Sequence, residues 1–315
     1  MNFNRKYKIA SALITAAISV AFVACEDKIN PALQKAEPVL VVDAWINNMP
    51  EAQTIVLSTT QPYLDNVLPV GAAGATITIS DNLGKVYQFK EDDKVAGNYV
   101  WKPTANEVFG KVGLSYKLSV TLKGETFEAV SKMNRTTKID SITFDTEKET
   151  GGTKLITRGE FWASDRKGLG DCYWIKAYKN GVLLNKPAEI NFAYDAGFSP
   201  GGGDKQDSVV FIPPIRRGIN SRDKDESKGA AGNLPPFVDG DSIDVQIHSI
   251  TYSSFNYLNE LTIQTDRPGG FSELFSKPLA NVSTNIKNTN VNGSKAVGFF
   301  NVAAVSRLGK RYKKK

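Results

Sequence analysis

Apolar and polar residues alternate with a period of two along much of this chain, and this pattern constrains the fold more than any other feature. In the segment 115–123, Tyr116, Leu118, Val120 and Leu122 alternate with lysine, serine and threonine. Successive side chains of a strand point to opposite faces of a sheet, so we expect one buried and one solvated face here. A helix would instead need apolar residues three or four positions apart. The chain is therefore predicted to be mainly β.

The same pattern recurs from Pro38 to residue 137, with turn residues between the candidate strands. The sequence "DNLG" and the pair Lys123-Gly124 each separate two alternating runs, which is typical of β-hairpins. The candidate strands lie within residues 39–46, 53–61, 74–89, 97–103 and 114–132. Short strands at this spacing predict an immunoglobulin-like or transthyretin-like β-sandwich over residues 38–137.

The strand pattern restarts after "NRTTKIDSITF", which predicts a domain boundary near residue 138 and a second, β-rich, sandwich-like domain over residues 138–309. Its candidate strands lie within residues 153–164, 172–184, 240–252 and 295–308. The pair Asn180-Gly181 predicts a hairpin turn. The last of these segments is expected to complete the second sheet.

Two other segments of this half have a different character. Residues 198–233 are rich in Gly, Ser, Asp and Lys, which indicates a functional or a disordered loop. In "SSFNYLNELTIQTD", residues 253–266, Phe255, Leu258 and Thr262 share a helical face, so we expect one short helix with Ser253 or Ser254 as its N-cap.

The N-terminus has the features of a signal peptide. Three bases within residues 5–8 precede an uncharged segment, residues 9–24, that is shorter than a membrane-spanning helix needs and contains many small side chains. The sequence "FVAC", which ends at Cys25, resembles a bacterial lipobox, with Phe22 in place of the usual leucine. Residues 1–24 are therefore predicted to be a lipoprotein signal peptide. The alternative is cleavage by an ordinary signal peptidase, which would leave Cys25 as a free thiol.

A lipidated Cys25 would carry two or three acyl chains, palmitate among them, and hold the protein firmly at a membrane. Glu26 and Asp27 resemble the acidic run that follows the lipidated cysteine in surface-exported lipoproteins of Bacteroidota. The sequence "KINPALQKAEP", residues 28–38, contains two prolines and mixed charge, so residues 25–37 are predicted to be a lipidated tether. The expected location is the outer membrane, at the cell surface.

The net charge of +6 comes from the two ends of the chain. Three bases lie in the signal peptide and five in the tail "KRYKKK", residues 310–315, so the body between them has two more acids than bases. This body has no basic face interleaved with aromatic residues, so we predict no nucleic-acid partner. The basic tail is expected to be a frayed terminus, or to bind acidic lipid headgroups or a partner.

Residues that could support catalysis are few. His248 is the only histidine and lies in a strand pattern, and Cys172 lies beside aromatic residues, so both are expected to be structural. The sequence "DGDSID", residues 239–244, lacks the later ligands of a calcium loop and is expected to be a polar turn. We therefore predict no catalytic residue, no metal site and no cofactor. Tyr194 and Phe198, at the start of the long polar segment, are candidates for binding a ligand or partner.

The order of these segments resembles a family of Bacteroidota lipoproteins, domain of unknown function 4249. The resemblance rests on the lipobox with "CED" and on "EPVLVVDAWINN", "YKLSVTLKGETFEA", "IDSITF" and "GDSIDVQIHSITYSSFNYLNEL", and most of all on "PLANVSTNI" before "KAVGFFNVAAVSR". It implies an outer-membrane lipoprotein with an N-terminal sandwich and a C-terminal β-rich domain. It also implies an accessory or binding role beside a TonB-dependent transporter, and it assigns no catalytic residue.

Together these observations predict a non-enzymatic, lipid-anchored binding or accessory protein at the outer membrane. One alternative is a surface enzyme that acts on glycans through carboxylates of the segment 198–233, which would require two facing acids in a cleft. The other is a structural or adhesive surface lipoprotein, which would show exposed edge strands and no pocket.

Overall fold

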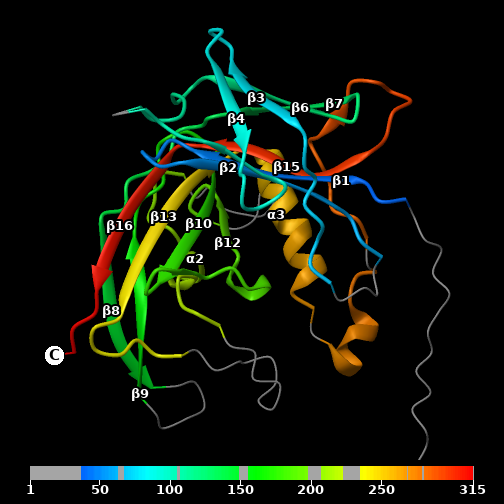
Figure 1. Cartoon of the computed structure of the whole chain (residues 1–315). Coiled ribbons are helices and arrows are strands. Elements are labelled where there is room, and N and C mark those ends of the chain that lie inside the picture. Colours follow the sequence, from blue (N-terminus) through cyan, green and yellow to red (C-terminus); the bar gives the residue numbers. More distant parts are fainter. Residues whose placement is uncertain are drawn as a thin grey trace, which may run out of the picture. The chain divides into compact units, whose positions relative to one another are not determined.

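Nine strands of the described residues form one sheet, in the order β14-β7-β6-β3-β4-β5-β2-β1-β15 (Figure 1). The structure is a computed structural model and describes residues 37–62, 67–104, 107–148, 155–197, 207–222, 235–267, 269–278 and 280–314. The strands are β1 (Leu40–Asn47), β2 (Gln53–Thr59), β3 (Thr76–Asp81), β4 (Val86–Glu91), β5 (Asn98–Trp101), β6 (Ser115–Leu122), β7 (Glu125–Lys132), β14 (Lys287–Asn288) and β15 (Ala296–Ala303). All neighbouring pairs in this sheet are antiparallel except β1 and β15.

This sheet curls so that β15, at one end, approaches β7, near the other end. The backbone N–H of Val302 donates to Ser131 Oγ at 3.1 Å, and Asn134 forms a parallel bridge with Ala303. The inner face of the curled sheet encloses a core. This core includes Ile55, from β2, and other apolar residues of nearly every strand. The predicted mainly β, sandwich-like fold is confirmed.

The alternation that predicted these strands has the expected structural consequence. Tyr116, Leu118 and Val120 are fully buried, and Leu122 is partly buried against the same core. At the hairpin between β6 and β7, Lys123 and Gly124 both have positive φ angles, 50° and 83°. Such a turn matches the right-handed twist of the flanking strands.

The C-terminal apolar segment differs from the prediction that it completes the second sheet as one strand. It forms two strands: β15 pairs with β1 in the first sheet, whereas β16 (Val305–Arg311) pairs with β13 (Ser242–Ile250) in the second. The change of sheet occurs at Ala304, whose N–H donates to Ser249 Oγ at 2.8 Å, while Asn48 Oδ1 accepts from Val305 N at 2.9 Å. The two side chains therefore accept hydrogen bonds from backbone N–H groups at the point where the chain leaves one sheet and enters the other.

The second sheet of the described residues contains β11-β10-β13-β16, and β12 pairs with β10 beside β11. Its remaining strands are β10 (Cys172–Lys179), β11 (Val182–Leu183) and β12 (Asn191–Tyr194). Strands β8 (Ser141–Lys148) and β9 (Leu155–Trp162) form a separate antiparallel ribbon. The other helical segments are η1 (Pro187–Glu189), α2 (Pro213–Arg217), α3 (Tyr252–Thr265) and η3 (Gly270–Phe275).

A second core lies between the ribbon, α2 and one face of this sheet. Phe161 of β9 and Tyr173 of β10 both pack against Phe211, with ring centroids 5.9 and 5.4 Å apart. These three residues are fully buried. Of the four tryptophans expected in the core, only Trp101 is buried, and the other three are half-buried in contact with neighbouring side chains.

Helix α3 matches the predicted helical face but not the predicted cap. Phe255 and Leu258 are buried, as the spacing predicted. The N-cap is Thr251, whose Oγ1 accepts from Ser254 N at 3.2 Å, and not Ser253 or Ser254. Thr251 follows β13 directly, so the strand itself decides where the helix begins.

Residues 38–315 form one compact unit, in which the two cores are built from different parts of the chain. The first core ends at Met133 and the second begins at Ile139, on either side of the predicted boundary near residue 138. Residues 286–304, however, return to the first core. That residues 38–137 and 138–309 are separate domains stays a prediction.

Candidate functional site: a basic and aromatic groove

The predicted site residues lie mostly outside the described part of the chain. The predicted signal peptide 1–24, Cys25, Glu26, Asp27 and Phe198 are outside the described residues. Tyr194 is described: it ends β12, is half-buried, and packs edge-on against Tyr252 and Phe255 at 5.9 and 6.0 Å. Its ring therefore contacts α3, and its role in binding stays a prediction.

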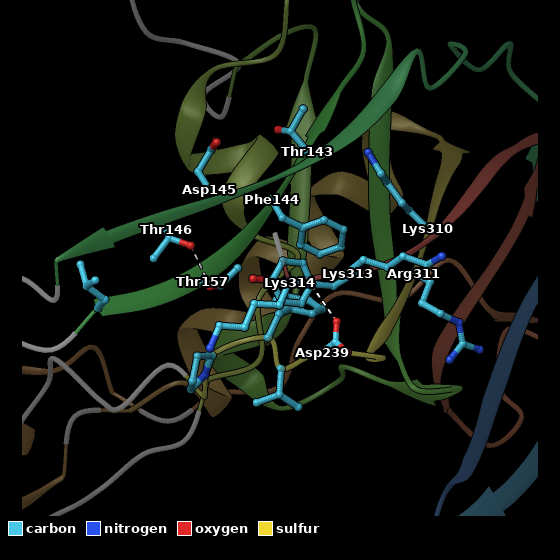
Figure 2. Close-up of a pocket in the computed structure, with 15 residues that line it drawn as sticks. Thr143, Phe144, Asp145, Thr146, Thr157, Asp239, Lys310, Arg311, Lys313 and Lys314 are labelled. Carbon is cyan, nitrogen blue, oxygen red and sulfur yellow. Dashed lines mark hydrogen bonds between the residues drawn. The ribbon is translucent and has the colours of Figure 1, made fainter.

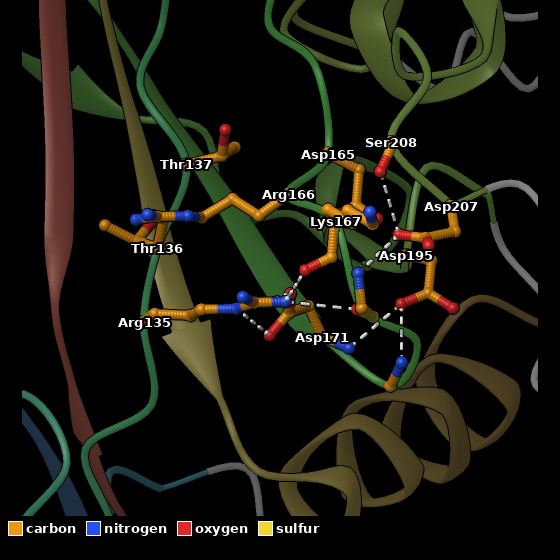
Figure 3. A network of polar contacts seen from close by, with 12 residues as sticks. Arg135, Thr136, Thr137, Asp165, Arg166, Lys167, Asp171, Asp195, Asp207 and Ser208 are labelled. Carbon is orange, nitrogen blue, oxygen red and sulfur yellow. Dashed lines mark hydrogen bonds and ion pairs between the residues drawn. The ribbon is translucent and has the colours of Figure 1, made fainter.

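A polar network lies beside Tyr194 and holds the loop between β9 and β10 (Figure 3). Arg135 donates to both carboxylate oxygens of Asp171, at 2.6 to 3.1 Å, and to the carbonyls of Lys167 and Gly168. Charge-assisted, bidentate contacts of this kind are among the stronger hydrogen bonds in proteins. The guanidinium thus fixes a loop that has no regular secondary structure.

Two further carboxylates of this network bind the same loop through its backbone. Asp195 Oδ1 accepts from the N–H groups of Gly170 and Asp171, at 2.7 and 2.9 Å, and Asp207 Oδ1 accepts from Gly168 N at 2.9 Å. Each acid therefore has an intramolecular role. No group of three or more His, Cys, Asp or Glu side chains lies close enough to hold a metal ion within the described ranges.

Asp165 is buried, as Asp195 is, but it differs from the other acids of the network in having a buried carboxylate oxygen without a hydrogen-bond partner in the described part of the chain. The hydroxyl of Tyr173 donates to its Oδ1 at 2.6 Å, while its buried Oδ2 has no partner among the described residues. Burial, assisted by the charges of Asp195 and Asp171, raises the pKa of Asp165 to about 6, although the Tyr173 and backbone hydrogen bonds oppose this shift.

The lone histidine and the described cysteine are placed as the sequence predicted. His248 is buried and its Nε2 lies 3.0 Å from Gln246 Oε1; burial and the charge of Lys176 hold the pKa of His248 well below its usual value. The Cys172 thiol is buried, and burial raises its pKa to about 12. A protonated thiol is a poor nucleophile, and both side chains are buried within strands of the second sheet.

The three acids of "DGDSID" have separate protein partners, as expected of a polar turn. Asp241 accepts from Asn180 and pairs with Lys179, Asp244 pairs with Arg307 at 2.7 Å, and Asp239 accepts from Lys314 N at 2.7 Å. This last contact also shows that the basic tail differs from the expected frayed terminus.

The tail is ordered because the second sheet extends into it. Lys310 and Arg311 belong to β16, and Tyr312 exchanges backbone hydrogen bonds with the 240–241 turn, at 2.7 and 3.0 Å. The sequence of the tail, five bases in six residues, gives no sign of this pairing, because the partner turn lies about seventy residues away.

The tail forms one wall of an open groove of about 1080 Å³, with β8 opposite it (Figure 2). Its aromatic residues are Phe144, Phe237 and Tyr312; the ring of Phe144 lies 5.1 Å from that of Phe237 and 5.0 Å from that of Tyr312. The charged side chains of its lining are Asp145, Asp239, Lys310, Arg311, Lys313 and Lys314. Aromatic side chains and an excess of bases suit an elongated, acidic ligand with apolar side groups.

Sequence reasoning missed this groove. Its lining comes from residues 143–146, 155–157, 236–239 and 310–314, which only the tertiary structure brings together. The single available signal was the aromatic Tyr312 within the basic tail.

Comparison with known families finds a match that covers most of the chain. The family described as Domain of unknown function (DUF4249) matches residues 26–308. The chain belongs to this family. The matched range of this DUF4249 protein includes β8 and ends within β16, while the bases of the groove, Lys310, Arg311, Lys313 and Lys314, follow it. Neither the curated proteins nor the solved structures contain a match. Within the described residues, no helix has the length and apolar character to cross a membrane.

Proposed function

We propose that this DUF4249 protein is a non-enzymatic, lipid-anchored binding protein at the outer-membrane surface, where it acts as an accessory to a TonB-dependent transporter. The observation that carries the binding role is the groove: its exposed Lys313 and Lys314 have no ion-pair partner among the described residues. The acids of the polar network, in contrast, hold their own loop. The anchor is supported by the "FVAC" sequence that ends at Cys25.

The glycan-active alternative receives no support from the described residues. It requires two facing acids of the segment 198–233 in a cleft. Asp207, which lies in the described part of that segment, accepts from a backbone N–H group. The other acids of the segment lie outside the described residues.

The anchor is tested by Cys25→Ser. Without a thiol to receive the diacylglycerol, the variant is expected to remain in the soluble fraction after sedimentation of membranes, and to incorporate no labelled palmitate. Cys172→Ser is the matched control and should sediment as the wild type does. Membrane association of Cys25→Ser at the wild-type level would contradict the proposal.

Surface exposure and partnership need their own measurements. The double variant Glu26→Ala, Asp27→Ala is expected to stay in the membrane fraction but to become resistant to protease added to intact cells. Cross-linking of the wild-type protein in its native membrane, followed by mass spectrometry, should identify a TonB-dependent transporter. The absence of any transporter among the cross-linked proteins would contradict the accessory role.

A further inference from the structure

Two edge strands border the groove. Among the residues that the structure describes, β8 pairs only with β9, and β16 pairs only with β13. Each strand therefore has one edge whose backbone N–H and C=O groups lack a strand partner. Such edges are where an additional strand can pair.

The two free edges face each other and separate along the groove. At the closed end, Ser306 Oγ accepts from Ile139 N at 3.2 Å, and Lys310 Nζ donates to the carbonyl of Ile142 at 2.5 Å. The Ile142 carbonyl therefore points toward β16. Because backbone groups of a strand alternate in direction, those of Phe144 and Thr146 point the same way, into the groove.

The side chains that line the groove indicate which side chains an added strand should have. Lys310, Arg311, Lys313 and Lys314 outnumber the two lining acids, Asp145 and Asp239, and Asp239 already accepts from the tail. The aromatic residues of the lining, Phe144, Phe237 and Tyr312, offer contacts to apolar side chains on the other face of an extended segment.

We infer that the groove binds an extended acidic polypeptide segment of a partner, which adds as a strand to the free edge of β8 and places its carboxylates against the basic tail. This inference rests on the proposed binding function, and it names the chemistry of the partner: alternating acidic and apolar residues. Main-chain hydrogen bonds would supply affinity, and the charges would supply orientation and specificity.

The probe is a fluorescein-labelled peptide of about seven residues that alternates glutamate and valine, close to the length of a typical strand. Fluorescence anisotropy with the full-length mature protein at low salt should show binding about tenfold tighter than that of the lysine–valine counterpart, and the difference should shrink as salt is added. Equal binding of the two peptides would overturn the inference.

Strand addition is tested with two further peptides, each N-methylated at alternate backbone nitrogens. A strand that pairs with one edge donates from alternate residues, so at least one methylated form should lose binding. If both methylated peptides bind as the unmodified one does, the ligand does not add as a strand and the inference fails.

The basic wall is tested by Lys313→Glu combined with Lys314→Glu, which should weaken binding of the acidic peptide about tenfold or more. Lys90→Glu combined with Lys94→Glu is the matched control, since Lys90 on β4 and Lys94 in the turn after it are both exposed, and it should bind as the wild type does. Thermal unfolding of each variant checks that it folds. Unchanged affinity in the tail variant, with cross-linking to a transporter intact in membranes, would overturn the groove assignment and leave the proposed function standing.

Discussion

At the scale of single residues, the polar side chains of this protein mostly serve its own structure. Arg135 binds the loop before β10, Asp195 and Asp207 bind the backbone of that loop, and His248 is paired with Gln246. Buried polar groups need such partners because an unmet hydrogen bond costs about 1–3 kcal/mol. Asp165 departs from this pattern, with an unpaired Oδ2; among the described residues, single atoms of Arg158, Glu160 and Arg216 also lack a hydrogen-bond partner.

Asp165 gives a pH-dependent prediction. Its pKa is raised from 3.8 to about 6 in the folded protein, so the folded state binds this proton more tightly than the unfolded state. The resulting stabilisation is complete below pH 4 and is lost as the pH rises through 6. In Asp165→Asn this dependence is absent, so the stability of the variant relative to wild type should increase by up to about 3 kcal/mol between pH 4 and pH 7.

Urea unfolding of the wild type and Asp165→Asn across this pH range measures the effect. The change with pH is the readout, because the new amide also alters stability by an amount that does not depend on pH. A stability difference that stays constant from pH 4 to pH 7 would show that folding does not raise the pKa of Asp165.

At the scale of elements, the parallel pairing of β15 with β1 holds the C-terminal segment in the first sheet. Gly298 lies at its centre, opposite Val42, with a φ of +93°. A Cβ at this position would lie 2.1 Å from the carbonyl oxygen of Val42. Only glycine combines this backbone conformation with so close an approach of two strands.

Gly298→Ala should therefore destabilise the protein by more than about 3 kcal/mol, through backbone strain and loss of the β1–β15 ladder. Gly240→Ala is the matched control, because Gly240 also has a positive φ, +90°, but has open space around its Cβ. Strain alone predicts a loss of about 1 kcal/mol there. Urea unfolding measures both losses of stability. Equal losses in the two variants would show that the close approach of β1 and β15 adds nothing to the cost of Gly298→Ala.

At the scale of the whole molecule, the chain passes from its first sheet to its second at two places. It first passes from the first core to the second between Met133 and Ile139. Near the C-terminus, β15 pairs within the first sheet and the next strand, β16, pairs within the second. Ser249 links the two passages, since its Oγ donates to Asn134 O and accepts from Ala304 N, each at 2.8 Å.

This arrangement predicts the behaviour of an isolated N-terminal half. A polypeptide of residues 38–137 lacks β15 and with it Phe300 and Val302, which are fully buried in the first core. It should show no cooperative unfolding transition by circular dichroism, because a core open on one side loses the burial that stabilises it. Cooperative unfolding of residues 38–137 alone would establish the boundary near residue 138 as a domain boundary.

Local patterns in the sequence predicted those features of the fold that depend only on residues close together in the chain. The buried face of β6, the turn at Lys123-Gly124 and the apolar face of α3 follow from the periodicity and turn chemistry of a few adjacent residues. The cap of α3 was predicted two or three residues too late because β13 continues to Ile250 and leaves Thr251 at the boundary. Only the structure shows that α3, which lies about sixty residues later, packs against Tyr194.

The sequence was enough to establish the β class, the turns of the hairpins and the structural positions of Cys172 and His248, because alternation and composition act through adjacent residues. The tertiary structure decided which sheet receives each half of the C-terminal segment, why the basic tail is ordered and where the groove lies. Those features depend on pairing between strands far apart in the chain, and hydrogen bonding between backbones leaves almost no trace in the identities of the paired residues.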